Sequence, residues 1–226
     1  MHEVVDRAGW LEARRALLAK EKALTRLRDE VASARRELPW ERVELDYQFE
    51  GPDGSETLGD LFAGKHQLIV YHFMYGPDWE EGCKSCSFWA DQYDAVNLHI
   101  GARDVALAVV SRAPWQTFQP FKARMGWRFK WVSSAGSSFN EDYGVSFPGR
   151  ERGIYNYRET DVMEELPGLS VFYRDDDGAL YHTYSAYSRG LDALNAVYQM
   201  LDLVPKGRDE AALDYPMAWV RHHDRY

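Results

Sequence analysis

Cysteine is nearly absent from the sequence, since the 226 residues include only two. A framework of several disulfides is therefore excluded, and so is a zinc site built from two CxxC pairs. The two cysteines, Cys83 and Cys86, lie three positions apart, and two cysteines placed at random in a chain of this length would rarely do so. This pair is the most specific feature of the composition.

Long apolar segments are absent as well. The longest, residues 68–75, is interrupted by His72 and is far too short to cross a bilayer as a helix. The first 30 residues alternate charged and apolar side chains and contain no continuous apolar stretch of the kind found in secretory signals. We therefore expect a cytoplasmic protein, in which a thiol pair is kept reduced unless it is in use.

Positive charge is in deficit, with 27 basic against 36 acidic residues and a formal net charge of -9. An acidic chain has no general attraction for nucleic-acid phosphates or anionic lipid headgroups, so we expect no nucleic acid and no membrane as a partner. Hydrophobic residues make up 45% and charged residues 28%, which is ordinary for a globular protein.

Glycine and proline are absent between Trp10 and Leu38, which predicts one long helix over about residues 7–38. Its apolar stripe has two interpretations: it packs on the domain that follows, or it forms a two-helix seam with a second protomer. The second interpretation predicts a homodimer through this helix. The stripe repeats every seven residues, at Trp10, Leu17, Leu24, Val31 and Leu38.

The rest of the chain alternates predicted strands and helices. Two apolar runs, residues 67–75 and 105–110, predict central strands buried on both faces. Alternating β and α units predict parallel crossovers, and two β-rich runs joined by Asp177-Gly178 predict a hairpin. The predicted fold class is α/β, with a mixed central sheet and flanking helices. Further predicted elements are a half-buried strand at 42–49, a strand near 128–132, and helices at 57–62, 83–99, 191–203 and after Pro114.

Three regions follow from these elements. They are an N-terminal helical extension at 1–40, a sheet-containing domain at 41–204, and a C-terminal tail at 205–226 that is expected to pack on the domain. A polar, loop-rich stretch at 133–165 is interpreted as an insertion before the final hairpin. The adjacent His222 and His223 near the end of the chain are interpreted as part of a solvated tail.

The two cysteines follow a buried strand through a loop and begin a predicted helix. Unpaired N–H groups and the helix dipole at such a position favour thiolate over thiol. Cys83 is therefore the predicted nucleophile, and Cys86, nearly one turn inward, is the predicted resolving thiol. Lys84 adds a positive charge nearby, which Glu80 and Glu81 oppose.

Four other residues are candidates for supporting roles. Pro167 precedes the predicted hairpin; it is either a cis-proline that offers a backbone edge to an extended substrate, or an ordinary loop proline. His72 is either a hydrogen-bonded core residue or the proton acceptor of Cys86, with Asp78 as its rival for that task. Trp79, in the loop before Cys83, is expected to line a shallow apolar substrate surface.

A metal site is the main alternative use of the two cysteines, because a CxxC is half of a common zinc site. A second CxxC is missing, and the seven histidines form no pair at the spacing of a zinc finger. We therefore expect no metal and no tightly bound cofactor.

The run YHFMYGPDWEEGCKSCSFWAD, which spans both cysteines, resembles the signature of a bacterial domain-of-unknown-function family, the one numbered 899. The segments LPGLSVFYRDDDGALYHTYSAYSRG and YPMAWVRHHDRY extend the resemblance over nearly the whole chain. This family belongs among the thioredoxin-like proteins. The resemblance implies a thioredoxin-like fold, a dithiol at Cys83 and Cys86, and Pro167 at the place of the superfamily's cis-proline.

Two further segments, TLGDLFAGKHQLIVYHF and EDYGV, are similar to peroxiredoxin sequences. The peroxiredoxin nucleophile motif, P-x-x-x-T/S-x-x-C, is nevertheless missing, because Gly76 and Trp79 stand seven residues before the two cysteines. The chain also departs from thioredoxin, since its CKSC dithiol has no Gly-Pro between the cysteines.

The leading hypothesis is a thiol–disulfide oxidoreductase that acts on a protein or small disulfide and receives electrons from a separate redox partner. One alternative is a peroxiredoxin-like thiol peroxidase, in which Cys83 becomes a sulfenic acid and Cys86 closes the disulfide. The other alternative is a non-enzymatic interaction or redox-sensing module that uses the long N-terminal helix.

Overall fold

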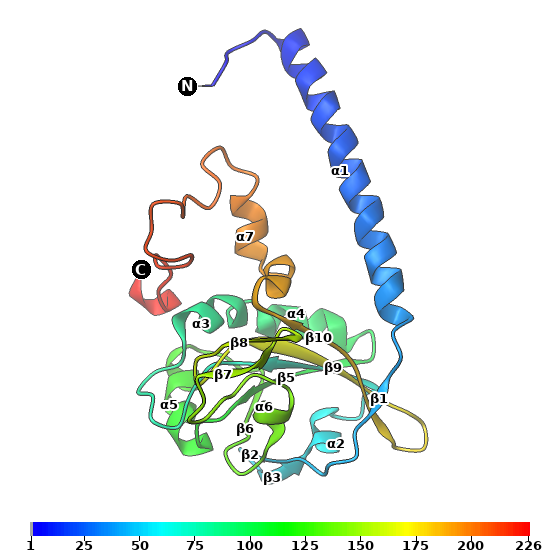
Figure 1. Cartoon of the computed structure of the whole chain (residues 1–226), viewed down its shortest axis with the longest axis vertical. Coiled ribbons are helices and arrows are strands. Elements are labelled where there is room, and N and C mark those ends of the chain that lie inside the picture. Colours follow the sequence, from blue (N-terminus) through cyan, green and yellow to red (C-terminus); the bar gives the residue numbers. More distant parts are fainter. Residues whose placement is uncertain (1) are drawn as a thin grey trace. The chain divides into compact units, whose positions relative to one another are not determined.

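A computed structural model describes residues 2–226, which fall into two compact units that meet between Pro39 and Trp40. The first unit is dominated by α1 (Arg7–Arg36), a single unbroken helix (Figure 1). The side chain of Asp6 caps this helix by accepting a hydrogen bond from the Gly9 N–H at 2.8 Å. Packing of the seven-residue stripe on the second unit or on another copy stays a prediction.

The second unit is built on a mixed sheet of eight strands in the order β1-β10-β9-β4-β5-β6-β2-β3 (Figure 1). The neighbours β4, β5 and β6 are parallel, whereas β9 is antiparallel to β4 and β10 is antiparallel to β9. The predicted mixed sheet is therefore present. The strands are β1 (Glu41–Arg42), β2 (Gln48–Gly51), β3 (Gly54–Thr57), β4 (Gln67–His72), β5 (Val105–Ser111), β6 (Lys130–Ser133), β9 (Gly168–Arg174) and β10 (Leu180–Tyr187).

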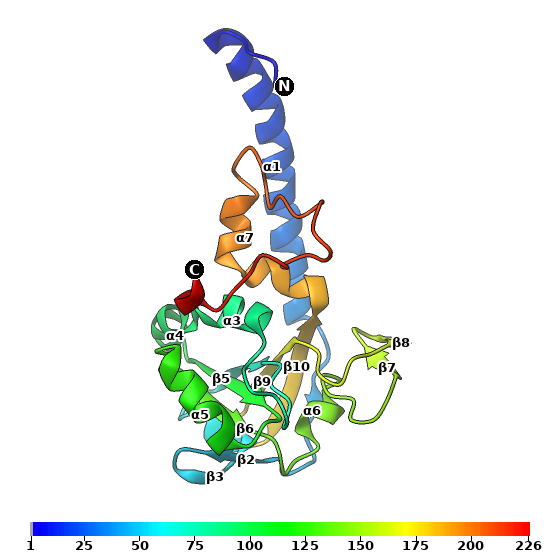
Figure 2. The ribbon, with the colours of Figure 1, turned by 90° about the vertical axis from the view of Figure 1, so that its left-hand side faces the viewer.

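Helices cover both faces of this sheet, because alternate residues of the central strands are apolar on both sides. One face carries Tyr71 and Phe73 and packs against α3 (Lys84–Ala90), α4 (Tyr93–Gly101) and α5 (Trp115–Arg124). The other face carries Leu68 and Val70 and packs against α2 (Leu58–Leu61) and α6 (Phe139–Asp142). Figure 2 shows α3, α4 and α5 on one side of the sheet and α6 on the opposite side.

The predicted strand at 42–49 is wrong as a single strand. Its beginning forms β1, which pairs with β10 at one edge of the sheet, and its end forms β2, which pairs with β6 and β3 near the other edge. Val43, Tyr47 and Phe49 of this segment pack against the same core, whereas Leu45 between them is 57% exposed. The period of two therefore marks neither one strand nor one continuous contact surface.

Three other elements differ from expectation. The predicted helix at 83–99 breaks between α3 and α4, and the break turns Tyr93 into the core against Tyr71. The final helix is a 3-10 segment, η1 (Ser188–Leu194), followed by the short α7 (Ala196–Leu201). The loop-rich insertion contains a hairpin of β7 (Arg152–Tyr155) and β8 (Arg158–Asp161) in addition to α6.

The chain ends in the short 3-10 segment η2 (His223–Arg225). Within residues 2–226 no helix combines the length and the apolar character needed to cross a membrane.

Candidate functional site

Cys83 stands at the N-terminal cap of α3, next to the end of strand β4. Its N–H donates to the Met74 carbonyl at 3.1 Å, which ties the start of the helix to the chain that continues from the strand. The carbonyl of Cys83 accepts from both the N–H and the hydroxyl of Ser87 at 2.9 Å. Both cysteines carry free thiols; Cys83 is partly exposed, whereas Cys86 is 2% exposed.

The two thiols have opposite pKa shifts. A hydrogen bond from the Cys86 side chain, together with the backbone N–H groups of Cys86 and Ser85, outweighs burial and lowers the pKa of Cys83 to about 7. Burial raises the pKa of Cys86 well above its ordinary value, and the bond that it donates to Cys83 raises it further. At neutral pH, about half of Cys83 is therefore thiolate, whereas Cys86 stays a thiol.

Neutral donors surround the sulfur of Cys86. The Met74 N–H lies 3.4 Å from Sγ, and the hydroxyl of Tyr71 also bonds to this sulfur. Burial raises the pKa of Tyr71 and of Tyr93 well above 10, so both hydroxyls stay protonated. The Met74 N–H and the Tyr71 hydroxyl stabilise negative charge on Cys86 at the moment when it forms.

His72 lies on the opposite face of the sheet from the two cysteines. Its Nε2 is 2.9 Å from the Ser170 hydroxyl, and its ring packs against Phe139 and Tyr143. Burial, followed by the nearby His182, lowers the pKa of His72 to about 3. The strand alternates its side chains, so the neighbour of Tyr71 points away from the dithiol. The structure corrects the hypothesis that His72 takes the proton of Cys86.

The loop before Cys83 places its two candidates differently. Asp78 is exposed. Trp79 is half-buried and packs against the core that contains Tyr71 and Phe73. It also packs against Gly76, where an added Cβ would lie 2.8 Å from the indole Nε1. This close approach requires glycine at position 76. Trp79 is not among the residues that line the pocket beside Cys86.

Lys84 and Pro167 lie near the dithiol in roles that differ from those expected. The Nζ of Lys84 donates to the Ala218 carbonyl at 2.9 Å and lies over the Tyr215 ring, so it holds the C-terminal segment on α3. No peptide bond within residues 2–226 is cis, so the cis interpretation of Pro167 is corrected to trans. Pro167 nevertheless lines the same pocket as Cys86.

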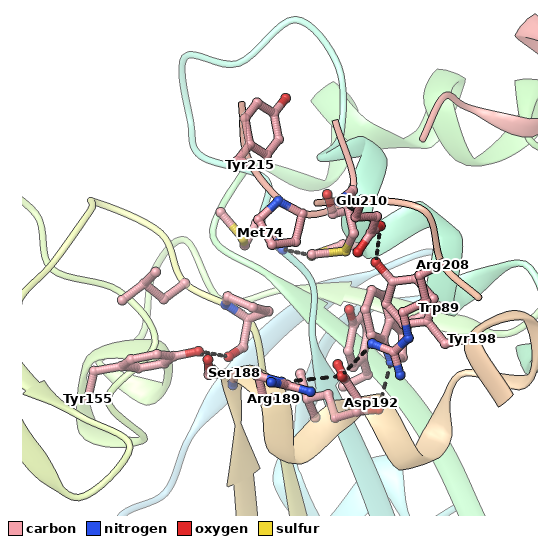
Figure 3. Close-up of a pocket in the computed structure, with 18 of the residues that line it drawn as sticks. Met74, Trp89, Tyr155, Ser188, Arg189, Asp192, Tyr198, Arg208, Glu210 and Tyr215 are labelled. Atoms are coloured by element: carbon pink, nitrogen blue, oxygen red, sulfur yellow. Dashed lines mark hydrogen bonds and ion pairs between the residues drawn. The ribbon is translucent and has the colours of Figure 1, made fainter. Parts of the chain in front are cut away.

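That pocket has a volume of about 750 Å³ and is walled by segments far apart in the sequence (Figure 3). Cys86 and its neighbour Ser85 form part of one wall. Apart from Pro167, sequence reasoning missed the other walls, because long polar stretches carry no periodic signal of where they fold back. The insertion contributes Tyr155, and the segment just after it contributes Leu166 and Pro167. The η1–α7 region contributes Ser188, Arg189, Leu191, Asp192 and Tyr198, and the C-terminal segment contributes Arg208, Glu210, Tyr215, Pro216 and Met217.

The charged side chains of the pocket are bonded to one another (Figure 3). Arg208 donates to Asp202 and to Asp192 at 2.9 Å and lies over the Tyr198 ring. One carboxylate oxygen of Glu210 accepts from the Tyr198 hydroxyl, the Met217 N–H and the Trp219 indole N–H, at 2.6–2.9 Å. The arginines are thus paired with aspartates, whereas neutral donors hold Glu210.

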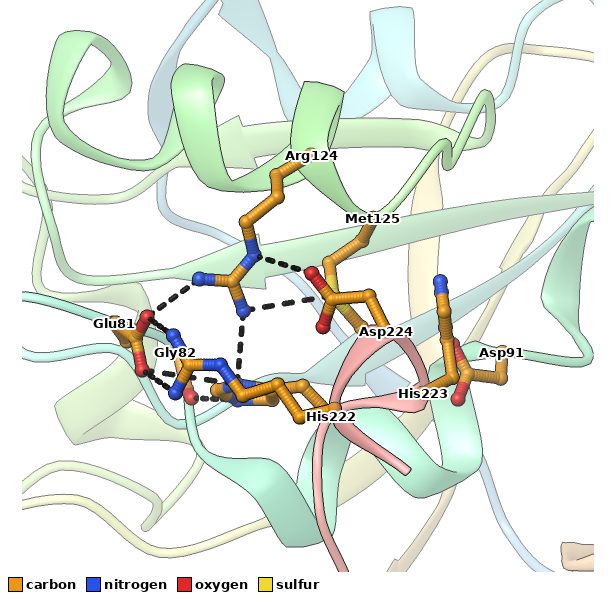
Figure 4. Close-up of polar contacts among 9 residues, drawn as sticks. Glu81, Gly82, Asp91, Arg124, Met125, His222, His223 and Asp224 are labelled. Atoms are coloured by element: carbon orange, nitrogen blue, oxygen red, sulfur yellow. Dashed lines mark hydrogen bonds and ion pairs between the residues drawn. The ribbon is translucent and has the colours of Figure 1, made fainter.

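Polar contacts fasten the end of the chain to Glu81 and Gly82, in the loop before Cys83, and to Arg124 of α5 (Figure 4). His222 is buried; its Nε2–H donates to the Gly82 carbonyl, and its Nδ1 accepts from Arg124, both at 2.9 Å. Glu81 binds the guanidinium groups of Arg124 and Arg225. The interpretation of the two histidines as a solvated tail is therefore wrong for His222. Their spacing gave no sign that the chain returns to the dithiol loop.

Metal ligation has no geometric support in the described part of the chain. Within residues 2–226, no three His, Cys, Asp or Glu side chains gather in a way that could hold a metal ion.

Solved structures similar to this chain share its fold at low sequence identity. A cysteine-to-serine mutant of Xanthomonas campestris peroxiredoxin Q matches with a TM-score of 0.51 and 15% identity, covering 73% of this chain and 97% of that one. A second structure of that peroxiredoxin (structure F4) matches with a TM-score of 0.50 and 14% identity, covering 71% and 93%. The X. campestris bacterioferritin comigratory protein matches with a TM-score of 0.50 and 14% identity, covering 71% and 94%.

These matches confirm the predicted thioredoxin-like fold. No match was found among curated proteins. The family described as "Bacterial protein of unknown function (DUF899)" matches residues 1–226, so the chain belongs to this family, as the run around the dithiol predicted.

Proposed function

We propose that this protein is a thiol–disulfide oxidoreductase in which Cys83 is the nucleophile and Cys86 the resolving thiol. The observation that carries the proposal is the difference between the two thiols. Cys83 is partly exposed and has a pKa of about 7, whereas Cys86 is buried and has a raised pKa. An attacking thiol works best with a pKa near the ambient pH, whereas a resolving thiol must wait until the first step is complete.

In the first step, the Cys83 thiolate attacks one sulfur of a substrate disulfide. A Cys83–substrate disulfide forms, the substrate S–S bond breaks, and the other half of the substrate leaves as a thiolate. In the second step, deprotonated Cys86 attacks Sγ of Cys83, which breaks the mixed disulfide and releases the second thiol. Two electrons pass to the substrate, and a separate dithiol reductant returns the Cys83–Cys86 disulfide to the reduced pair.

The first step itself activates the second. The negative charge on Cys83 and the hydrogen bond that it accepts both hold the proton on Cys86. Once Cys83 is in a mixed disulfide, its charge is gone and both of these effects are lost, so the pKa of Cys86 falls. The Met74 N–H and the Tyr71 hydroxyl then stabilise the new thiolate. The proton of Cys86 passes to the leaving thiolate of the substrate or to water.

Thiol trapping in a graded dithiothreitol series, combined with thiolate absorbance against pH, tests this proposal. The expected result is a reversible intramolecular disulfide and a Cys83 thiolate that titrates near pH 7. The Cys86→Ser variant is expected to accumulate a mixed disulfide with its substrate, whereas Cys83→Ser forms none. Two thiols that never pair and that titrate at ordinary values would contradict the proposal and favour a non-enzymatic module.

A thiol peroxidase is the second candidate, because the similar structures are peroxiredoxins and one is described in connection with alkyl peroxide reduction. In that reaction the Cys83 thiolate takes one oxygen from a hydroperoxide and becomes a sulfenic acid, and the alcohol leaves. Cys86 then condenses with the sulfenic acid to form the disulfide and water. The absence of the peroxiredoxin nucleophile motif weighs against this reaction. Rapid consumption of one hydroperoxide per dithiol would place it ahead of disulfide exchange.

A further inference from the structure

The dithiol is flanked on both sides by residues that hold the C-terminal segment in place. Lys84 bonds to the Ala218 carbonyl, and the Gly82 carbonyl accepts from His222. On the next turn of α3, the Phe88 ring packs edge-on against Trp219 at 5.5 Å between ring centres. A folded protein that brought its own disulfide to Cys83 would have to displace these contacts.

The backbone beside Pro167, where an extended peptide would pair, is already bonded. The Pro167 carbonyl accepts from the Tyr155 hydroxyl at 2.8 Å, and the Leu166 N–H donates to the Val145 carbonyl at 2.8 Å. Recognition of a peptide by strand addition requires free N–H and C=O groups at such an edge. This part of the chain therefore offers an extended peptide little to pair with.

What stays open beside Cys86 is the pocket itself. Cys83 does not line this pocket, but its sulfur is hydrogen-bonded to that of Cys86, which does. Its volume of about 750 Å³ lies in the range of about 300–1,000 Å³ that is typical of small-molecule sites. Aromatic, aliphatic and thioether side chains provide most of the lining, and these favour an apolar and polarisable ligand. They are Tyr71, Met74, Trp89, Leu191, Tyr198 and Met217.

The charged side chains of the pocket leave no cation unpaired, because its two arginines face three carboxylates. Arg208 is neutralised by Asp192 and Asp202, and Glu210 already accepts three hydrogen bonds. Arg189 has an 88% exposed side chain and lies 3.5 Å from Asp192. An anionic ligand that entered would lose its hydration without gaining a counter-charge, and this loss is costly.

From these four observations we infer that the pocket binds a small, uncharged, mainly apolar organic disulfide, which is the substrate of the dithiol. This inference rests on the proposed function and narrows it from disulfides in general to one chemical class. The reaction is the two-step exchange described above, with both halves of the substrate released as thiols.

A matched pair of reagents tests the inference. Neutral 2,2′-dithiodipyridine and dianionic 6,6′-dithiodinicotinate share the same aromatic disulfide and release coloured thiones, so stopped-flow absorbance follows both. The rate with the reduced full-length protein is divided by the rate with free dithiothreitol, which removes the intrinsic reactivity of each reagent. We expect the neutral reagent to be favoured by about tenfold or more, equivalent to about 1.4 kcal/mol. Insulin, as a protein disulfide, is expected to react more slowly than the neutral reagent on the same scale.

Two variants connect this preference to the pocket. Leu166→Trp fills the pocket and should slow the neutral reagent, whereas Leu203→Trp, at an 84% exposed position outside the pocket, should not. Asp192→Asn keeps the shape of the side chain but removes the negative charge that pairs with the guanidinium groups of Arg189 and Arg208. This variant should therefore accelerate the dianionic reagent selectively. An unchanged Cys83 titration in each variant shows that the dithiol is intact.

The outcomes separate this inference from the proposed function. Equal normalised rates for both small reagents, or a preference for insulin, would overturn the inference and leave the oxidoreductase assignment in place. Thiols that react with every reagent no faster than dithiothreitol and never form the intramolecular disulfide would overturn both. Normal selectivity in Leu166→Trp and Asp192→Asn would place the preference outside this pocket.

Discussion

Tyr71 and His72 are neighbours in β4, yet they mark two very different buried environments. On the side of Tyr71, two thiols share a hydrogen bond and have opposite pKa shifts, and one of them, Cys86, lines a pocket. On the side of His72, an imidazole is sealed among aromatic rings with its Nδ1 unbonded and its pKa lowered by burial. Burial of a titratable group is thus common to both sides. Reactivity requires, in addition, a partner that compensates the charge and a route for the substrate.

The largest effect that tests this comparison comes from removing one titratable group on each side. Cys83→Ser is expected to reduce disulfide exchange on the order of a thousandfold or more, because it removes the nucleophile. His72→Gln should leave the exchange rate unchanged, because its side chain lies across the sheet from the dithiol. Turnover of a small disulfide by both variants measures this. A large loss of rate in a folded His72→Gln protein would mean that the two faces are functionally connected.

The second effect concerns stability on the side of His72. The folded pKa of about 3 lies below the unfolded value of about 6.5, so between these values only the unfolded chain binds the proton. Stability should therefore fall as the pH drops below 6.5, by about 2 kcal/mol down to pH 5. His72→Gln removes this dependence. Its stability deficit at pH 7, about 1–3 kcal/mol, should narrow at pH 5 in urea unfolding; parallel pH profiles for the two proteins would contradict this account.

The third effect concerns the hydrogen bond between the thiols. Cys86→Ala removes the largest cause of the low Cys83 pKa and leaves the backbone N–H groups. The pKa of Cys83 should rise toward that of a free thiol, about 8.5. The first step of exchange at pH 7 should slow by about threefold to tenfold as the thiolate fraction falls. Thiolate absorbance against pH measures the shift, and an unchanged midpoint would assign the low pKa to the backbone alone.

The same comparison explains what could be predicted from the sequence. The dithiol helix and the central strands follow from local patterns, namely a CxxC after an apolar run and alternation buried on both faces. The position of His72 on the far face was also implicit in that alternation, since Tyr71 and His72 are adjacent in one strand. The sequence does not say which of these two side chains shares a face with the dithiol. The packing of α3 in the structure shows that it is Tyr71.

The tail at 205–226 was expected to pack on the domain, but the pocket and the contacts of this C-terminal segment beside the dithiol could not be predicted in this way. Tyr155 and Glu210 lie in polar stretches whose residues show no period of two or of 3.6, and their contacts span long distances in sequence. The turn of the β7–β8 hairpin was missed because Asn156 and Tyr157 both adopt positive φ without the glycine that usually marks such a turn. Cys83, Cys86 and Pro167 were identified as one site by resemblance and context. Their roles in catalysis stay predictions until exchange is measured.

The smallest expected effect tests whether the C-terminal segment restricts access. Glu81 joins the segment to α5 through Arg225 and Arg124, and these partners lower the pKa of its carboxyl, so it is charged at neutral pH. Glu81→Gln weakens this junction at a partly exposed site, where an ion pair contributes about 0.2–1 kcal/mol. The rate of insulin reduction should therefore rise by about twofold, while a small neutral disulfide, which uses the pocket, should react at the same rate as with the unchanged protein.

Glu159→Gln, which removes an exposed carboxylate on the β7–β8 hairpin, is the matched control and should change neither rate. Equal acceleration of both substrates would show that the C-terminal segment limits the access of every disulfide to the dithiol. An unchanged rate with insulin would show that Glu81 does not restrict access through this segment.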